Sequence, residues 1–319
     1  MQQSIKIGTR GSPLALAQAN DVKSKLVAAH ADLSPENVEI VVIKTTGDRI
    51  LDKPLIEAGG KGLFTKEIEE ALLDSSIDCA VHSSKDMPTT LPDGLCLTVF
   101  LPREDPRDTF ISKKFSHFLD LPKGAVLGTA SLRRRALALR QRPDLKVINF
   151  RGNVQSRLRK LAEGDADARF LAQAGLNRLN MASVATEKLP LDEFLPAPAQ
   201  GAVTIEIRED NTKMASLLRP LHALETEIAV TAERAFLAAL DGSCRTPIAA
   251  YASVHGDSLI IKAKLLSLDG KQVFERNATC AATLEAAATT GNNIGLEIKA
   301  EAGEEFFERL YKEVGEEIL

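Results

Sequence analysis

The sequence predicts an α/β protein with two lobes, each a sheet covered by helices, and a small C-terminal α+β domain with an antiparallel sheet. Three observations predict it. Short apolar runs alternate with helical patterns over the first two hundred residues, two proline-rich segments interrupt this alternation, and the remainder changes to hairpin signals. Alternation of strand and helix is typical of helices packed over sheets.

The predicted strands and helices of the two lobes follow one another in a regular order. The first helix has Ser12 at its N-cap and Pro13 at N1, and its apolar residues Leu16, Ala19, Val22 and Leu26 share one face. The predicted strands lie within residues 5–9, 38–46, 77–81, 95–101, 125–129 and 146–150, and the predicted helices within 12–30, 65–73, 131–142 and 153–164.

Two segments rich in proline, 100–110 and 194–207, are interpreted as crossings between the lobes. Two crossings predict that the second lobe is inserted into the first. After residue 225 one helix is followed by three strands, whose turns "HGDS" and "LDGK" are typical of hairpins, and by closing helices. The predicted domains are therefore 1–101 with 200–219, 102–199, and 224–319.

Composition and charge exclude several classes of protein. The 319 residues are 44% hydrophobic and 26% charged, which is ordinary for a globular chain. The absence of long apolar stretches and of an export signal predicts a cytoplasmic protein without a membrane partner. A net charge of −4, no Trp and 4% aromatic residues argue against nucleic acid. Residues 129–160, however, hold ten Lys or Arg and one acid, which favours a local polyanion site.

The four cysteines show neither paired spacing nor accompanying histidines, so no metal site is predicted. Cys79 and Cys96 lie in apolar runs, and Cys280 lies in a featureless one, so all three are expected to be inert and packed in a core. Cys244 follows "DGS" and precedes "RTP". Its polar surroundings fit core packing worst.

Arginines recur where a strand turns into a helix. Arg10 lies in "GTRGSP", Arg133 and Arg134 lie in "GTASLRRR", and Arg151 lies in "FRGN". A helix N-terminus and a guanidinium both attract carboxylate or phosphate, so the set predicts an anion with several charged groups. Because "GGKGLF" is not a phosphate-binding loop, a small molecule with several carboxylates is the simplest ligand.

Two further segments each allow two interpretations. Residues 47–64, rich in glycine, are either a surface loop or a lid beside a cleft. "AVHSSKDMP" is either a polar turn or the place where one carboxylate, Asp86, is held near cations. Its His, Ser and Asp are too close along one strand end to form a catalytic triad.

The chain resembles the porphobilinogen deaminases, also called hydroxymethylbilane synthases. The resemblance covers nearly the whole chain in order, and its motifs are "GTRGSPLAL", "GGKGLFTKE", "AVHSSKDMP", "REDPRD", "GTASLRRR", "RGNVQSRL", "LAQAGLNRL", "AQGAV" and "TAERAFLAALDGSCRTPI". It implies two lobes similar to those of periplasmic binding proteins. It also implies one covalent dipyrromethane cofactor per chain, held by a thioether to Cys244.

The activity implied by the resemblance is the head-to-tail condensation of four porphobilinogen molecules with loss of ammonia, followed by release of the linear tetrapyrrole by water. Porphobilinogen is then the only expected partner, and nothing requires more than a monomer. Asp86 is similar to the catalytic carboxylate, which stabilises the cationic azafulvene. The resemblance implies cofactor contacts for Ser83, Lys85, Asp86, Thr129, Ser131, Arg133 and Arg134, and substrate contacts for Arg10, Ser12, Lys61, Phe64, Arg151, Arg157 and Gln200.

Four residues depart from the family pattern. Ala199 and Asn180 stand where glycine is common, Ser243 replaces a glycine before Cys244, and Arg169 stands where an apolar strand residue is common. Two other functions remain open from the residues alone. A two-lobed receptor for a small anion needs neither Cys244 nor Asp86, and a nucleotide-dependent transferase lacks its phosphate loop.

Overall fold

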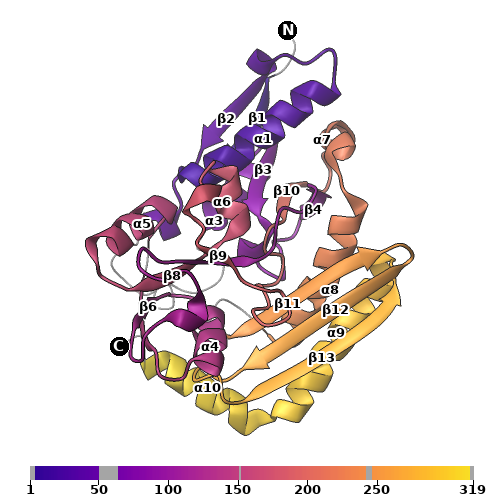
Figure 1. The fold of residues 1–319 in the computed structure, drawn as a ribbon. Helices are drawn as coiled ribbons and strands as arrows, with labels where there is room; N and C mark the ends of the chain where they lie inside the picture. Colours follow the sequence, from indigo (N-terminus) through magenta and orange to yellow (C-terminus); the bar gives the residue numbers. More distant parts are fainter. Residues whose placement is uncertain (1–3, 50–63, 151, 242–245, 317–319) are drawn as a thin grey trace. The chain divides into compact units, whose positions relative to one another are not determined.

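The computed structural model describes residues 4–49, 64–150, 152–241 and 246–316. Their helices and strands are drawn in Figure 1. The residues group into two compact units, of which the first is Met1–Glu104 with Ala202–Glu227 and the second is Asp105–Gly201 with Ile228–Leu319. The first unit holds one sheet, and the second unit holds two. Each unit is described by itself below.

The first two sheets share one strand order. The first is β2-β1-β3-β10-β4 and the second is β7-β6-β8-β5-β9. In both, the strand in fourth place comes from the crossing segment and runs antiparallel to its neighbours. The first sheet comprises β1 (Ile5–Thr9), β2 (Val38–Val42), β3 (Cys79–Ser83), β4 (Leu95–Phe100) and β10 (Val203–Arg208), and the second comprises β5 (Asp108–Ile111), β6 (Val126–Gly128), β7 (Lys146–Ile148), β8 (Ala168–Ala172) and β9 (Glu187–Lys188).

The third sheet is an antiparallel meander of β11 (Ile248–His255), β12 (Ser258–Leu266) and β13 (Val273–Ala281). Its two turns contain Gly256 and Gly270, both with positive φ, as the hairpin signals predicted. The α/β fold class with a small C-terminal antiparallel sheet is thus confirmed. The strands of the three sheets fall one sheet to each predicted domain, although the second and third sheets belong to one compact unit.

The helices follow the predicted pattern in most places. They are α1 (Pro13–Ala29), α2 (Thr46–Arg49), α3 (Lys66–Leu73), α4 (Leu132–Gln141), α5 (Val154–Glu163), α6 (Gln173–Arg178), α7 (Thr212–Leu218), α8 (Leu224–Ala239), α9 (Leu284–Ala302) and α10 (Glu304–Glu316). The Ser12 hydroxyl caps α1 by accepting from the Ala15 N–H, which confirms the predicted start. Leu16 is only partly buried, and Gln18 takes its place on the buried face. No helix in the described residues is long and apolar enough to span a bilayer.

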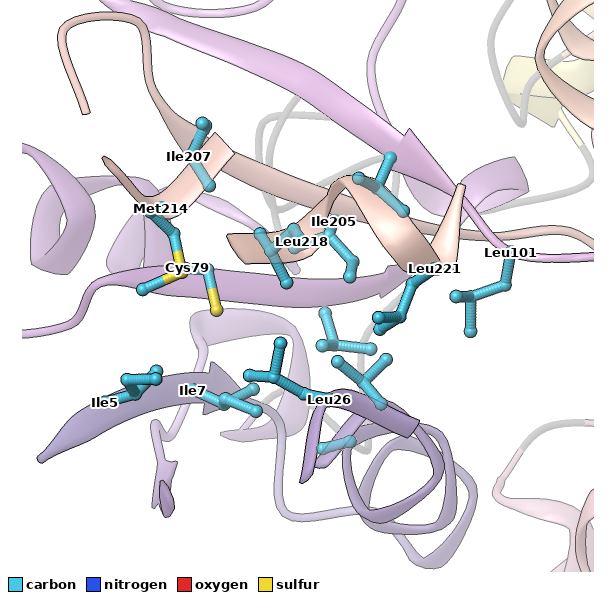
Figure 2. Packing of buried hydrophobic residues seen from close by; sticks show 14 of the residues in the cluster. Ile5, Ile7, Leu26, Cys79, Leu101, Ile205, Ile207, Met214, Leu218 and Leu221 are labelled. Atoms are coloured by element: carbon cyan, nitrogen blue, oxygen red, sulfur yellow. The ribbon is translucent and has the colours of Figure 1, made fainter. Parts of the chain in front are cut away.

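The core of the first unit lies between its sheet, α1 and α7. Figure 2 shows Ile7 on β1, Leu26 on α1 and Cys79 on β3 in one apolar cluster, which Ile205 of β10 joins from the returning chain. Cys79 is fully buried, as expected. Cys96 is partly buried and packs against this core, as expected. Cys280 is also only partly buried, so the expectation of core packing is wrong in degree for Cys280.

The core of the second unit is built on phenylalanine. Phe118 and Phe170 contact each other, and both contact Phe110 and Phe194, with ring centroids 4.8–6.4 Å apart. Such ring contacts each add about 0.5–1.5 kcal/mol to the stability gained by burial. Leu266 of β12 packs into the same cluster. The middle and C-terminal sheets therefore share a core, which explains why they form one unit.

Candidate active site

The polar residues of the first unit gather where β1 and β3 end. These strands are parallel neighbours, with Ile7 opposite Cys79 and Gly8 opposite Ala80. Because the carboxyl ends of parallel strands meet at one edge of a sheet, the turn after β1 lies beside the turn after β3. A cavity of about 70 Å³ opens there, lined by five of the predicted site residues, Arg10, Ser12, Phe64, Ser83 and Asp86.

Contacts with neighbouring side chains position Arg10, Phe64 and Ser83. The Arg10 guanidinium stacks on the Phe64 ring, 4.0 Å from its centroid. Ser83 lies at the end of β3 and is hydrogen-bonded to the Gln18 amide of α1, with 2.9 Å between Oγ and Nε2. The cavity thus combines a cation, hydroxyls and an aromatic face.

Asp86 is the carboxylate that lines this cavity. It ends the short 3₁₀ turn Ser84–Asp86, which a hydrogen bond from the Met87 N–H to the Ser84 carbonyl closes. Lys85 and Asp86 are exposed while Ser84 is buried, so the turn presents both charged side chains outward. The turn holds the backbone of Asp86 beside the cavity, where its carboxylate can stabilise positive charge on a ligand.

Two buried carboxylates, Glu69 and Glu206, lie near His82. His82, which also lines the cavity, contacts Glu206 on β10, with 3.1 Å between Nε2 and Oε2. Burial raises the pKa of the nearby Glu69 carboxyl, and the charge of Glu206 raises it further. The His82 contact with Glu206 could not be predicted from the sequence, because the strand return that brings β10 beside β3 joins positions far apart in the chain.

The second unit holds the other predicted residues that the structure describes. Thr129 follows β6, and the Ser131 hydroxyl caps α4 by accepting from the Arg134 N–H at 3.4 Å. Arg133 and Arg134 are buried, with 4% and 7% of their surface exposed. Arg157 lies on α5 and is partly buried. Arg133 and Arg134 thus lie at the start of α4, directly after the turn that follows β6, and Arg157 lies in the first half of α5.

Asp108 at the start of β5 is the internal partner of these arginines. Its Oδ1 accepts from Nη2 of Arg134 at 2.6 Å, and its Oδ2 lies 2.7 Å from Nη1 of Arg133. Gln200 also donates to Oδ1, at 3.0 Å. Burial by itself raises the pKa of Asp108, but the two guanidinium groups outweigh it and hold that pKa well below its usual range.

Three predicted residues, Lys61, Arg151 and Cys244, lie outside the described residues, as does Ser243. The structure thus places the remaining ones in two groups, one in each unit. Among the residues that the structure describes, no group of three or more His, Cys, Asp or Glu is placed to hold a metal.

Two known family models match this chain, and together they cover almost all of it. Residues 5–216 match the family model described as porphobilinogen deaminase, dipyromethane cofactor binding domain. Residues 227–300 match the model of the porphobilinogen deaminase C-terminal domain. The chain belongs to the porphobilinogen deaminase family. The family, the enzyme class and the dipyrromethane cofactor expected from the sequence are thereby confirmed.

Individual porphobilinogen deaminases are similar over the same length. That of Nitrobacter hamburgensis is 54% identical over 301 residues, 94% of both chains. The chloroplastic enzyme of Oryza sativa subsp. japonica is 55% identical, over 96% of this chain and 86% of its own. That of Paracoccus denitrificans is 52% identical, over 96% and 97%. A solved nutrient-binding protein from Burkholderia cenocepacia is far more distant, with 18% identity and a TM-score of 0.42 over 67% of this chain and 90% of its own.

Proposed function

We propose that this chain condenses four porphobilinogen molecules head to tail, with loss of ammonia, on a dipyrromethane attached to Cys244. Water then releases hydroxymethylbilane, and the dipyrromethane stays on the chain. The observation that carries the proposal is the cavity at the ends of β1 and β3, where Asp86 and Arg10 line the same space. One group suits the cationic centre of the reacting pyrrole, and the other suits its carboxylates.

Asp86 is the proposed catalytic residue. Loss of ammonia leaves positive charge on the carbon and ring of the substrate. A carboxylate held beside the cavity by the closed turn after β3 stabilises this charge electrostatically. The same oxygens accept hydrogen bonds from pyrrole N–H groups, which orients the ring for attack.

Arg10 and its neighbours are proposed to bind and orient the substrate. Stacking on Phe64 keeps the Arg10 guanidinium plane in place, so its N–H groups meet a carboxylate in a fixed orientation. Ser12 caps the start of α1, and the partial positive charge of this helix N-terminus favours an anion. Lys61, Arg151, Arg157 and Gln200 are proposed to bind the same substrate.

The donors of the second unit fit the cofactor's chemistry, which is a short pyrrole chain bearing several carboxylates. Thr129 and Ser131 offer hydroxyls, and Arg133 and Arg134 offer cations beside one internal carboxylate, Asp108. These four residues, with Ser83, Lys85 and Asp86, are proposed to hold it. When bound, the cofactor supplies the nucleophilic pyrrole carbon that receives the first substrate.

We further propose a cytoplasmic monomer whose partner is porphobilinogen, with no nucleic acid or membrane. The same proposal includes three domains, which are residues 1–101 with 200–219, residues 102–199 and residues 224–319. The competing function is a receptor that binds a small anion without converting it. Only the enzyme uses up porphobilinogen, so turnover separates the two.

The test is the consumption of porphobilinogen, followed as uroporphyrin after oxidation of the product. Asp86→Asn should lower the rate by at least about a hundredfold, since loss of one fixed electrostatic group typically costs a factor of 10² to 10³. Asp93→Asn makes the same change in an exposed residue of the same unit and should leave the rate unchanged. A rate for Asp86→Asn equal to that of this control contradicts the assigned role.

A further inference from the structure

Arg169 is a buried cation that the reaction described above does not use. It lies in β8, opposite Ile111 of β5 and Gly128 of β6, and 1% of its surface is exposed. Leu171, two residues further on, belongs to the apolar cluster on one face of the sheet. Because strand side chains alternate, Arg169 lies on that same face, where an apolar residue is the ordinary choice.

The hydrogen-bonding groups of Arg169 are mostly unused. Its Nη2 donates to the Phe170 carbonyl at 3.4 Å, which is a long hydrogen bond. Its Nε and Nη1 are buried without a partner, and none of the ion pairs found among the described residues includes Arg169. A buried guanidinium without an anion is costly, so two free donors in the interior need an explanation.

The surroundings of Arg169 are built to hold it in place. Its guanidinium carbon lies 5.3 Å from the centroid of the Phe150 ring. That ring in turn rests on Gly128, because a Cβ at Gly128 would come within 2.7 Å of it. Gly128 is the last residue of β6 and Phe150 follows β7, so Arg169 lies close to the carboxyl ends of both strands.

Other cations increase the positive charge around Arg169. Arg134 donates through Nη1 to the same Phe170 carbonyl, also at 3.4 Å. Burial lowers the pKa of Arg169 well below its usual range, and the charges of Arg157 and Arg134 lower it further. A guanidinium keeps its proton, so the free-energy cost of this buried charge is offset by a bound anion and not by loss of the proton. Arg157 is only partly buried, so the cluster of Arg134, Arg157 and Arg169 extends from the interior to the surface.

We propose that Arg169 binds a carboxylate of the pyrrole chain through the planar fork of Nε, which has no partner, and Nη2, which makes only the long hydrogen bond to Phe170. The assignment rests on the proposed function, because the pyrroles supply that carboxylate. It adds a donor to the recognition of the chain at a position where the family pattern has an apolar residue. The carboxylate belongs either to the resident cofactor or to an incoming unit.

Arg169→Leu tests the proposal, with two measurements that separate these sources. If the carboxylate belongs to an incoming unit, KM for porphobilinogen rises about ten- to a hundredfold, the range for one lost hydrogen bond to a charged group. If it belongs to the cofactor, the purified variant lacks the added mass of the dipyrrole in intact mass spectrometry. An unchanged KM together with full cofactor content overturns the proposal.

A control variant and an alternative variant complete this test. Arg142→Leu makes the same substitution in an arginine that pairs with Asp144, and neither KM nor cofactor content should change. If Arg169→Leu does not fold, Arg169→Lys keeps a cation but removes the planar fork, and should change the same quantity by a smaller factor. Wild-type values for a folded Arg169→Lys overturn the assignment of a bidentate contact.

A third measurement separates failure of this inference from failure of the proposed function. If the wild-type chain carries no added mass and leaves porphobilinogen unchanged, the proposed function is wrong. In that case the carboxylate site is tested by itself. The urea-unfolding midpoints of the wild type and of Arg169→Leu are each measured in sodium propionate and in sodium chloride of equal ionic strength. A carboxylate site predicts that propionate raises the wild-type midpoint more than chloride does, and that Arg169→Leu loses the difference. Equal midpoints in the two salts overturn the site.

Discussion

Replacing Asp108 by Asn tests the arrangement of buried charge in the second unit. Asp108 is completely buried and is the carboxylate that faces Arg133 and Arg134, whose exposed fractions are 4% and 7%. Asn keeps the shape and still accepts hydrogen bonds, but the two guanidinium groups lose their counter-charge. Removing one partner of a buried ion pair costs about 3–5 kcal/mol, because the other charge stays buried.

The assay is urea and thermal unfolding of the full chain, followed by circular dichroism. A loss of this size corresponds to a fall in Tm on the order of 10 °C for a unit of this size. Asp144→Asn is the matched control, because Asp144 forms the same kind of pair with Arg142, at 2.7 Å, near the surface. Its effect should be small, since solvent screens such pairs. If Asp108→Asn unfolds with the control, the buried carboxylate does not stabilise this unit.

Three further predictions concern the backbone, a thiol and pH. Ala199→Gly should raise the free energy of unfolding by up to about 1 kcal/mol, because Ala199 has a φ of 62° and only glycine adopts this region freely. The control Ala202→Gly should not raise the free energy of unfolding, since Ala202 is not among the described residues with positive φ. Burial raises the pKa of the Cys79 thiol, so iodoacetamide should label Cys280 in the native protein well before Cys79, and equal rates in peptide mapping contradict this. Because the folded-state pKa of Asp108 is lowered, its contribution to stability is present above about pH 4 and is lost as the pH falls further, so acid titration of Asp108→Asn should show a shallower loss than wild type.

Much of the fold could be predicted because its signals are local. Periodicity identified the long strands and helices, Ser12 with Pro13 marked the start of α1, and the glycine turns marked the hairpins. The strands β5 and β9 carry weaker signals, because they have only four and two residues and are defined by their neighbours in the sheet. Arg169 likewise obscured β8, although the Phe150 ring allows a cation within it.

The departures from the family pattern have a physical meaning that sequence could not supply. Ala199 and Asn180 both have positive φ, 62° and 55°, which is the backbone region where glycine is the ordinary choice. Asn tolerates this region better than Ala does, so the strain is expected at Ala199. The sequence shows that glycine is absent at these two positions. It does not show the backbone conformation that makes glycine favourable there.

The charged partners of the site residues were the least predictable part. The arginines could be predicted to form an anion site from their positions in strand-to-helix turns. Asp108 was missed because 26 residues separate it from Arg134, and nothing local marks one acid among many as the partner. The pairing depends on the order of strands in the sheet, which brings β5 beside β8.

The central claim is that Cys244 carries a pyrrole chain that grows by single porphobilinogen units. Intact mass spectrometry after addition of limiting porphobilinogen tests it most directly. We expect the purified chain to be heavier than its sequence by one dipyrrole, further species to appear at regular intervals of one pyrrole unit, and Cys244→Ala to show neither. A wild-type chain with the mass of its sequence alone, unchanged by porphobilinogen, would contradict the account.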